Sequence, residues 1–332
     1  MSRRYFALFI ALSIATAVSA QTAKPATAPV KKWTPPRTAW GDPDLQGWFT
    51  NLQEDGTPLE RPDQFAGRSL DDIKGEELAA IKRDTQKRTI TTFQGPLHAP
   101  ENWWQNDLHL EKGSQAWFVV DPPDGKIPPL TQDAKDRAAA RAAARRASGR
   151  GPADSWEDLT LYDRCITRGL PGSMMPVIYG NSYQILQSPG FVSIRYEMVH
   201  ETRLIPLDGR PHAGSDIRSY MGDPRGRWEG DTLVVETTNF RDDGAYRNAN
   251  GATLRLIERF TRTAPDKVRW SVTVDDPKTW TKPWTFSMPL TMDDSQPVLE
   301  YSCHEGNYGL QNILKAARSE ERKAEKKAAD AK

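Results

Sequence analysis

The feature that most constrains the fold is a long stretch, residues 177–304, in which apolar and polar side chains alternate. Side chains of a β-strand point in turn to opposite faces of the sheet, so this alternation predicts strands with one buried face. Clusters of Gly, Pro, Asp and Asn separate the runs, and the links are too short for the helical crossovers that parallel strands need. The pattern therefore predicts a mainly β domain with an antiparallel sheet over residues 177–314.

We expect about eight strands in this sheet. They are Trp117–Val120, Tyr183–Gln187, Phe191–Ile205, Trp228–Phe240, Thr253–Arg262, Val268–Asp275, Trp284–Leu290 and Val298–Cys303. Antiparallel strands that follow one another in this way are typical of a closed β-barrel or of a β-sandwich, with the remaining helices at the periphery.

The first twenty residues have the three parts of a signal peptide. Arg3 and Arg4 are followed by an apolar stretch, and the small residues Val18-Ser19-Ala20 precede Gln21. The apolar stretch is too short for a membrane span. Residues 1–20 therefore predict export to the periplasm or the medium. The Sec route is favoured over the twin-arginine route, because the basic region is very short and no basic residue precedes the cleavage site.

Four further segments follow from composition. Residues 21–44 are rich in Pro and predict an extended lead-in, because proline fixes φ and lacks a backbone donor. Residues 45–176 predict an irregular and helical region that packs on the barrel, and the Ala/Arg run 133–148 within it predicts a solvated helix. The Glu, Lys and Ala residues of 315–332 predict a charged helical tail. Beyond the leader, no segment is long and apolar enough to span a membrane.

The charge balance argues against one class of partner. Removal of the leader takes two arginines away and leaves 43 basic and 44 acidic side chains, a net charge of −1. Nucleic-acid-binding domains usually carry a clear basic excess on one face. We therefore expect no nucleic acid as a partner.

The chain has two cysteines, Cys165 and Cys303. In an oxidising compartment an isolated pair is most simply a disulfide. The alternative is a metal or haem thiolate at Cys303, beside His304, but the chain lacks the CxxC and CxxCH spacings that would support it.

Three expected strands each place one ionisable residue on an otherwise apolar face: His200, Glu236 and Glu258. An unpaired buried carboxylate costs several kcal/mol, so these groups must be paired, protonated or in contact with a wet cavity. Two acids and an imidazole suit general acid–base catalysis, and they could equally hold a divalent metal. The structural alternative is salt bridges to nearby arginines and a hydrogen-bonded core histidine. A β-bulge would reverse the assignment of faces.

Around these groups the sequence indicates a ligand site. Tyr196, Trp228 and Trp284 would provide aromatic surface, and Arg203 an anion contact. The polar corner after the last expected strand would add further contacts, with His212 on the same rim. The candidate substrate-binding residues are Tyr196, Arg203, His212, Trp228, Trp284, His304, Glu305 and Asn307. The simpler interpretation of each is a core aromatic or a surface-loop residue.

Several strings occur together: DPPDGKIPPLT (121–131), DRCITRGLPGSMMP (163–176), YEMVHETRLIPLDGRPH (196–212), GDPRGRWEGDTLVVETTNF (222–240), DPKTWTKPWT (276–285) and YSCHEGNYGLQNIL (301–314). They resemble a large family of secreted proteins of environmental and soil bacteria, a likeness that covers roughly residues 33–318. It implies no particular activity. The second half also resembles lipocalin-type barrels, in which a Gly-x-Trp-x-Gly-Asp strand leads into a meander and the lumen binds small ligands.

Two classes of function remain open. The first is a hydrolase or lyase acting on a carbohydrate or another small substrate, with His200, Glu236 and Glu258 as acid–base groups. The second is a non-catalytic barrel that binds a small molecule or glycan. Serine-esterase, nucleotide-hydrolase and dinucleotide-binding motifs are absent from the sequence. We expect no cofactor, with a divalent metal as the alternative.

Overall fold

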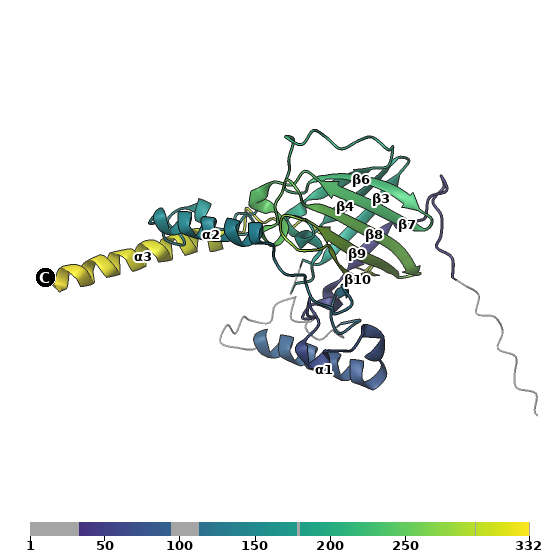
Figure 1. Ribbon diagram of the computed structural model, residues 1–332, viewed down its shortest axis with the longest axis horizontal. Helices are drawn as coiled ribbons and strands as arrows, with labels where there is room; N and C mark the ends of the chain where they lie inside the picture. Colours follow the sequence, from purple (N-terminus) through teal and green to yellow (C-terminus); the bar gives the residue numbers. More distant parts are fainter. Residues whose placement is uncertain (1–32, 94–112, 178–179, 296, 332) are drawn as a thin grey trace, which may run out of the picture. The chain divides into compact units, whose positions relative to one another are not determined.

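The computed structural model describes residues 33–93, 113–177, 180–295 and 297–331, and their helices and strands all lie in one compact unit, Pro35–Lys332. These residues form one ten-stranded sheet in which every strand pair is antiparallel. Nine of the strands curl into a nearly closed barrel with three α-helices at its periphery (Figure 1). The predicted antiparallel barrel is therefore confirmed, in preference to a sandwich.

Two meanders make up the barrel, and a short N-terminal strand joins them. The strands are β1 (Gly47–Thr50), β2 (Val119–Asp121), β3 (Ser182–Ser188), β4 (Phe191–Tyr196), β5 (Thr202–Pro206), β6 (Asp223–Glu229), β7 (Thr232–Thr238), β8 (Arg255–Ala264), β9 (Lys267–Asp275) and β10 (Trp284–Met292). Their order is β5-β4-β3-β1-β10-β9-β8-β7-β6, and β2 pairs with β10 off this path. The β structure thus begins before residue 177, since β1 lies between β3 and β10.

The two edges of this order, β5 and β6, meet through side-chain packing. A Cβ atom on Gly226 of β6 would lie 2.7 Å from Cγ2 of Ile205 in β5 and 2.5 Å from Cδ2 of Leu207. Real Cβ atoms do not approach other carbons so closely, so only glycine permits this contact. Gly226 therefore lets the edges close the barrel.

The expectation of one strand over Phe191–Ile205 is wrong. The chain makes a 3-10 turn, η7 (Met198–His200), between β4 and β5, and Val199 within it has φ of +58°. The Tyr196 N–H donates to the Glu201 carbonyl oxygen at 2.9 Å and closes the turn. Met198 and Val199 are both buried. Because the turn residues are apolar like those of the strands, the sequence pattern does not reveal the turn.

This turn changes which residues face the barrel interior. In β4 the buried positions are even-numbered, as at Ile194 and Tyr196, whereas in β5 they are the odd-numbered Arg203 and Ile205. Counting on from β4 in steps of two would put Arg203 on the outer face, but the turn reverses the count. Arg203 points inward.

A second correction concerns residues 228–240, expected to be one strand. The chain instead forms β6 and β7, joined at Gly230-Asp231. Leu233, Val234 and Val235 are all buried, so the sequence pattern does not tell which face is inside. With Thr237 buried and Glu236 partly exposed, the inner face carries the odd-numbered residues of β7. The placement of Glu236 on the apolar face is therefore wrong.

The expected strand Val298–Cys303 does not form either. Residues 297–302 have no regular secondary structure and lead into a turn before the last helix. The preceding strand, β10, already pairs with β9 on one side and with β1 and β2 on the other. Both of its edges are occupied, which leaves no position beside it for a further strand.

Large side chains from the inner faces of the strands and from adjoining segments form the core. Its largest fully buried members are Trp270, Trp284, Tyr183, Tyr196, Phe49, Phe118, Phe240, Phe260, Phe286, Leu45 and Leu170. The rings are in contact, with centroid separations of 5.5 Å for Trp270–Phe286 and 5.9 Å for Trp284–Phe286. Each such side chain contributes roughly 1.5–3 kcal/mol through burial.

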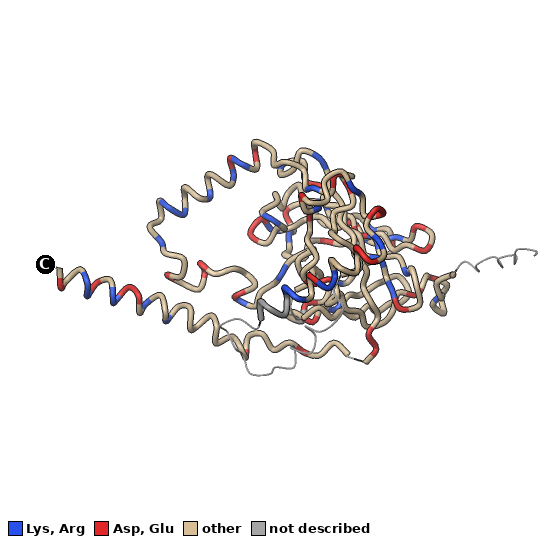
Figure 2. Tube along the Cα trace, turned by 90° about the horizontal axis from the view of Figure 1, so that it is seen from below, with Lys and Arg blue, Asp and Glu red and all other residues tan. Residues whose placement is uncertain are grey.

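The three α-helices are α1 (Gly75–Phe93), α2 (Gln132–Ala147) and α3 (Tyr308–Asp330). The predicted helix 133–148 is confirmed as α2, whose first turn is capped by the Thr131 hydroxyl accepting from the Ala134 N–H at 3.1 Å. The charged tail forms the distal part of α3, along which acidic and basic residues alternate (Figure 2). None of the helices in the described ranges is long and apolar enough to cross a membrane.

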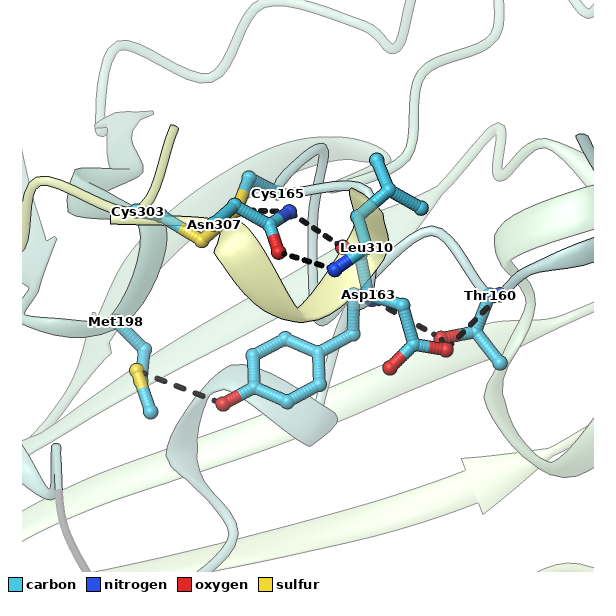
Figure 3. The surroundings of a disulfide bond; sticks show 8 residues. Thr160, Asp163, Cys165, Met198, Cys303, Asn307 and Leu310 are labelled. Carbon is cyan, nitrogen blue, oxygen red and sulfur yellow. Dashed lines mark hydrogen bonds between the residues drawn. A yellow bond between two sulfur atoms is a disulfide. The ribbon is translucent and has the colours of Figure 1, made fainter. Parts of the chain in front are cut away.

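The predicted disulfide between Cys165 and Cys303 is confirmed (Figure 3). It joins a segment before β3 to a segment after β10. The Asn307 side chain supports the same corner, because its amide donates to the Asp163 carbonyl oxygen at 2.8 Å and its oxygen caps α3 by accepting from the Leu310 N–H at 3.1 Å. The disulfide and this cap hold the start of α3 against the 160–165 segment.

Candidate acid–base site on the outer face of the barrel

Glu258, expected as a catalytic residue, lies inside the barrel with no exposed surface. Both of its carboxylate oxygens accept from the Arg203 guanidinium, with Oε1 at 3.1 Å from Nη2. The Trp270 indole N–H donates to the same Oε1 at 3.2 Å. Burial by itself would lower the pKa of Arg203, but Glu258 holds that pKa above its ordinary value. Glu258 and Arg203 thus form a buried ion pair of the core.

The aromatic residues expected to bind ligand belong largely to the same core. Tyr196 has no exposed surface, its hydroxyl lies near Arg203, and burial raises its pKa. Trp284 is also fully buried, with its ring 5.7 Å from that of Trp280, and Trp228 packs partly buried against the core. A ligand could reach Tyr196 or Trp284 only if the barrel opened.

The remaining residues of the expected site are spread over two other segments. The backbone of His200 lies in η7, and its side chain lies outside the described part, so its catalytic role stays a prediction. His304 and Glu305 are exposed in the turn that precedes α3, where Asn307 caps the helix. The disulfide fixes that corner.

The structure does bring two predicted residues together, His212 and Glu236. The His212 Nδ1 lies 3.1 Å from Oδ2 of Asp223, and its Nε2 lies 4.0 Å from Oε1 of Glu236. Asp223 and Glu236 lie on the outer face of β6 and β7, and His212 comes from the β5–β6 loop. All three side chains are 22–29% exposed. The imidazole therefore stands between two carboxylates at the surface.

Arginines hold both carboxylates in place. Arg225 Nη1 lies 2.6 Å from Asp223 Oδ1, and Arg255 Nε lies 3.0 Å from Glu236 Oε1. Partial burial would raise the pKa of Asp223. Hydrogen bonds from the Ala213 N–H, Arg225 and His212 outweigh that effect and hold the pKa below its ordinary value. Asp223 therefore remains an acceptor for His212.

The loop that carries His212 is fixed on both sides of the histidine. On the N-terminal side, Arg225 Nε donates to the Pro211 carbonyl oxygen at 2.9 Å. On the C-terminal side, the Asn239 amide donates to the carbonyl oxygens of Ala213, Gly214 and Ile217 at 3.0–3.2 Å. Asn239 itself has φ of +57°, a conformation that asparagine tolerates better than most residues. The imidazole position is thus set by the loop backbone.

This geometry suits proton transfer. A carboxylate that accepts from Nδ1–H fixes the tautomer in which Nε2 is free to act as a base. At 4.0 Å the Nε2 atom is too far from Glu236 for a direct hydrogen bond, so one oxygen of a substrate or water can contact both groups. Among the described residues, no group of three or more His, Cys, Asp or Glu side chains is arranged to hold a metal ion.

Three supporting residues of this site, Asp223, Arg225 and Asn239, were not expected from the sequence. The first two lie before the expected strand Trp228–Phe240, although they belong to β6. The sequence did offer an indication of this site. The side chains that form it, except Arg255, all fall in the two strings 196–212 and 222–240, so the two strings could have been expected to lie together in the fold.

The sequence strings that resemble secreted proteins of environmental bacteria include those that build this site. Comparisons with protein-family models, with curated proteins and with solved structures each found no significant match. That family resemblance therefore remains a prediction from the sequence strings.

Proposed function

We propose that this chain is an exported hydrolase or lyase that acts on a carbohydrate or another small substrate by proton transfer at His212 and Glu236. The observation that carries the proposal is the position of the imidazole, with Nδ1 3.1 Å from Asp223 and Nε2 4.0 Å from Glu236. A partly exposed histidine oriented by one carboxylate and approached by a second has the parts that general acid–base catalysis requires. Glu236 was expected in this role from the sequence.

Each residue has a distinct task in the proposed reaction. Asp223 orients the His212 ring and stabilises the imidazolium that forms when Nε2 takes up a proton. Glu236 accepts a hydrogen bond from the substrate or water that lies between it and Nε2. Arg255, 3.0 Å from Glu236, fixes the position of that carboxylate. Asp223 and Arg255 are therefore positioning residues, and His212 and Glu236 contact the substrate.

Hydrolysis and elimination both begin with the removal of a proton by the His212 Nε2 atom. In a hydrolase, Nε2 removes a proton from the water that attacks the scissile bond, and the imidazolium then donates that proton to the leaving group as the bond breaks. In a lyase, Nε2 removes a proton from the carbon next to a carbonyl or carboxylate group, and the leaving oxygen departs as a carbon–carbon double bond forms. The ultraviolet absorbance of a conjugated product separates the two reactions.

The test is a panel of glycosides, uronate polymers and simple esters assayed with purified mature protein. His212→Gln and Glu236→Gln should each lower kcat/KM by about 100-fold or more, a typical loss for an acid–base group. Glu229→Gln is the matched control. Glu229 is an outer-face glutamate that also accepts from arginines, Arg227 at 2.7 Å and Arg259 at 2.8 Å. Folded His212 and Glu236 variants with wild-type turnover would refute the proposal.

Export forms part of the proposal. Two features support it: the signal-peptide layout of residues 1–20 and a disulfide, which persists in oxidising compartments. N-terminal sequencing of protein from the periplasmic fraction and the medium should give chains that begin at Gln21. Recovery of the full-length chain from the cytoplasm alone would contradict export.

A further inference from the structure

A cavity of about 560 Å³, open to solvent on one side, is lined in part by residues 160–162, which precede the disulfide residue Cys165. Its walls come from residues 160–175 and 243–246, two segments far apart in the sequence. This volume is in the range of about 300–1,000 Å³ that is typical of small-molecule sites. The walls contain five residues of the DRCITRGLPGSMMP string, to which the proposed catalysis gives no role.

The walls are mainly apolar and aromatic. Leu161, Met175 and Ala245 provide aliphatic surface, and the rings of Tyr162 and Tyr246 line the same space. Tyr246 is packed against the core, with its ring 6.3 Å from that of Trp284, and Tyr162 is partly exposed. Such walls suit a flat hydrophobic ring.

Arg168 places a positive charge in this cavity. Its guanidinium carbon lies 5.3 Å from the centre of the Tyr162 ring, a cation–π contact that orients the group. Its Nη1 atom is buried and has no hydrogen-bond partner among the described residues. Arg168 as a whole is only partly buried, so a ligand anion in the cavity can accept from its guanidinium, for which no hydrogen-bond acceptor is present among the described residues.

The other polar side chains of the wall already have partners. Thr167 donates to Glu201 at 2.8 Å, Thr160 donates to Asp163 at 2.7 Å (Figure 3), and Asp243 accepts from Arg241 at 3.0 Å. A sugar needs many free donors and acceptors around its ring. An aromatic ring needs few, so these contacts favour an aromatic ligand over a sugar acid.

From these observations we infer that the cavity binds a small aromatic carboxylic acid. Its ring would lie between Tyr162 and Tyr246, and its carboxylate would accept from Arg168. The inference does not depend on the catalysis proposed at His212. None of the residues that line this cavity belongs to the His212 site, and the cavity has no histidine in its walls.

The experiment compares benzoate with benzamide, which has the same ring but no charge, by calorimetry and by tryptophan fluorescence. Trp284 lies next to Tyr246 and would report occupation of the cavity. Benzoate should bind saturably and at least about tenfold more tightly than benzamide, because a charged acceptor strengthens the bond to Arg168. Galacturonate, a sugar acid, should bind more weakly than benzoate.

Two variants and one control localise the binding. Arg168→Gln should weaken benzoate binding at least about tenfold and leave benzamide binding nearly unchanged. Gly172→Leu should block both ligands. Gly172 lines the cavity, and the nearest atom to an added Cβ is Arg168 Cβ at 4.0 Å. Arg164→Gln is the control, since Arg164 also stacks on an aromatic ring, that of Trp156 at 4.5 Å, but does not line this cavity.

Equal affinity for benzoate and benzamide would overturn the inference, as would tighter binding of galacturonate or no saturable binding by folded wild-type protein. Unchanged benzoate binding by Gly172→Leu would place the ligand elsewhere and also overturn it. This variant decides the question if Arg168→Gln does not fold. Loss of benzoate binding in Arg168→Gln with normal binding in Arg164→Gln supports the inference, whatever the catalytic assays of His212 show.

Discussion

Arg203 of β5 and Glu258 of β8 form an ion pair that crosses the inside of the barrel. The two strands are not neighbours in the sheet, and both side chains are almost completely buried, at 2% and 0% exposure. The guanidinium contacts both carboxylate oxygens, and Trp270 adds a third donor. This pair therefore connects the two meanders through the core, near the edge where β5 meets β6.

The pair predicts a specific pattern of stability. Glu258→Ala should lower the free energy of unfolding by about 3–5 kcal/mol, because Arg203 would be left buried without its counter-ion. The double variant Arg203→Met, Glu258→Leu should recover most of that loss, since an apolar pair needs no desolvated charge. Urea denaturation of the three proteins measures both values. A double variant as unstable as Glu258→Ala would contradict this account.

An exposed pair provides the control for that experiment. Arg259 and Glu229 are 2.8 Å apart on the outer face of the barrel, both at least 40% exposed. Arg259→Ala should change stability by less than about 1 kcal/mol, because water and salt screen such pairs.

The double variant of the buried pair, Arg203→Met with Glu258→Leu, should also retain turnover, since Glu258 has no surface for a substrate to contact.

Asp223 predicts a pH dependence. Its pKa is lowered in the folded state, so its contribution to stability is present above the unfolded value of about 3.9 and is lost as the pH falls through the folded value. Asp223→Asn should therefore cost about 1–3 kcal/mol at pH 7, the range for hydrogen bonds to charged groups. The difference from wild type should shrink in urea denaturation below about pH 3. An equal difference at both pH values would exclude this linkage.

Glu54 predicts a pH dependence of stability opposite in sign to that of Asp223. Burial raises its pKa, and the hydrogen bond that it accepts from the Ser114 N–H at 3.0 Å offsets this only in part. Between the unfolded and the folded pKa the native state binds the proton more tightly, so stability decreases as the pH rises through that window. Glu54→Gln keeps an acceptor for Ser114 and should show a smaller loss of stability between pH 4 and pH 7. Parallel pH–stability curves for the two proteins would contradict the prediction.

The disulfide predicts a large loss of stability when the cross-link is removed. It closes a loop with a sequence separation of 138, for which the chain-entropy model gives up to about 5 kcal/mol. Replacement of both Cys165 and Cys303 by Ala should lower the free energy of unfolding by an amount approaching that value. Asn307→Ala, which removes the cap of α3 and the hydrogen bond to the Asp163 carbonyl oxygen but keeps the disulfide, should cost about 1–2 kcal/mol. Similar losses in the two variants would show that the cross-link does little more than the cap.

The sequence predicts the fold class well because two strands of the second meander, β8 and β9, alternate cleanly. Residues of β8 and β9 show the period of two, and the expected bounds differ from the observed ones by a few residues. The sequence does not predict β1, a four-residue strand with little pattern of its own. Its existence depends on the free edges of β3 and β10, which are far away in the chain.

The candidate site was predicted less well, for a local reason. Whether a residue of a strand faces the core depends on counting in steps of two, and one extra turn reverses the count. The turn η7 does this between Tyr196 and Arg203, and the three consecutive buried residues before Glu236 remove the signal in β7. Glu236 therefore reaches His212 on the outside, and Arg203 meets Glu258 on the inside.

The disulfide makes residues 165–303 a covalent ring that carries β3 to β10, whereas β1 comes from outside that ring. This short strand pairs with β3 on one side and with β10 on the other, so it closes the gap between the two ends of the ringed sheet. The topology is that of a split-protein complementation system. A peptide bearing Gly47–Thr50, supplied in trans, would have a ready-made slot in the oxidised remainder, and barrel assembly would then depend on peptide concentration.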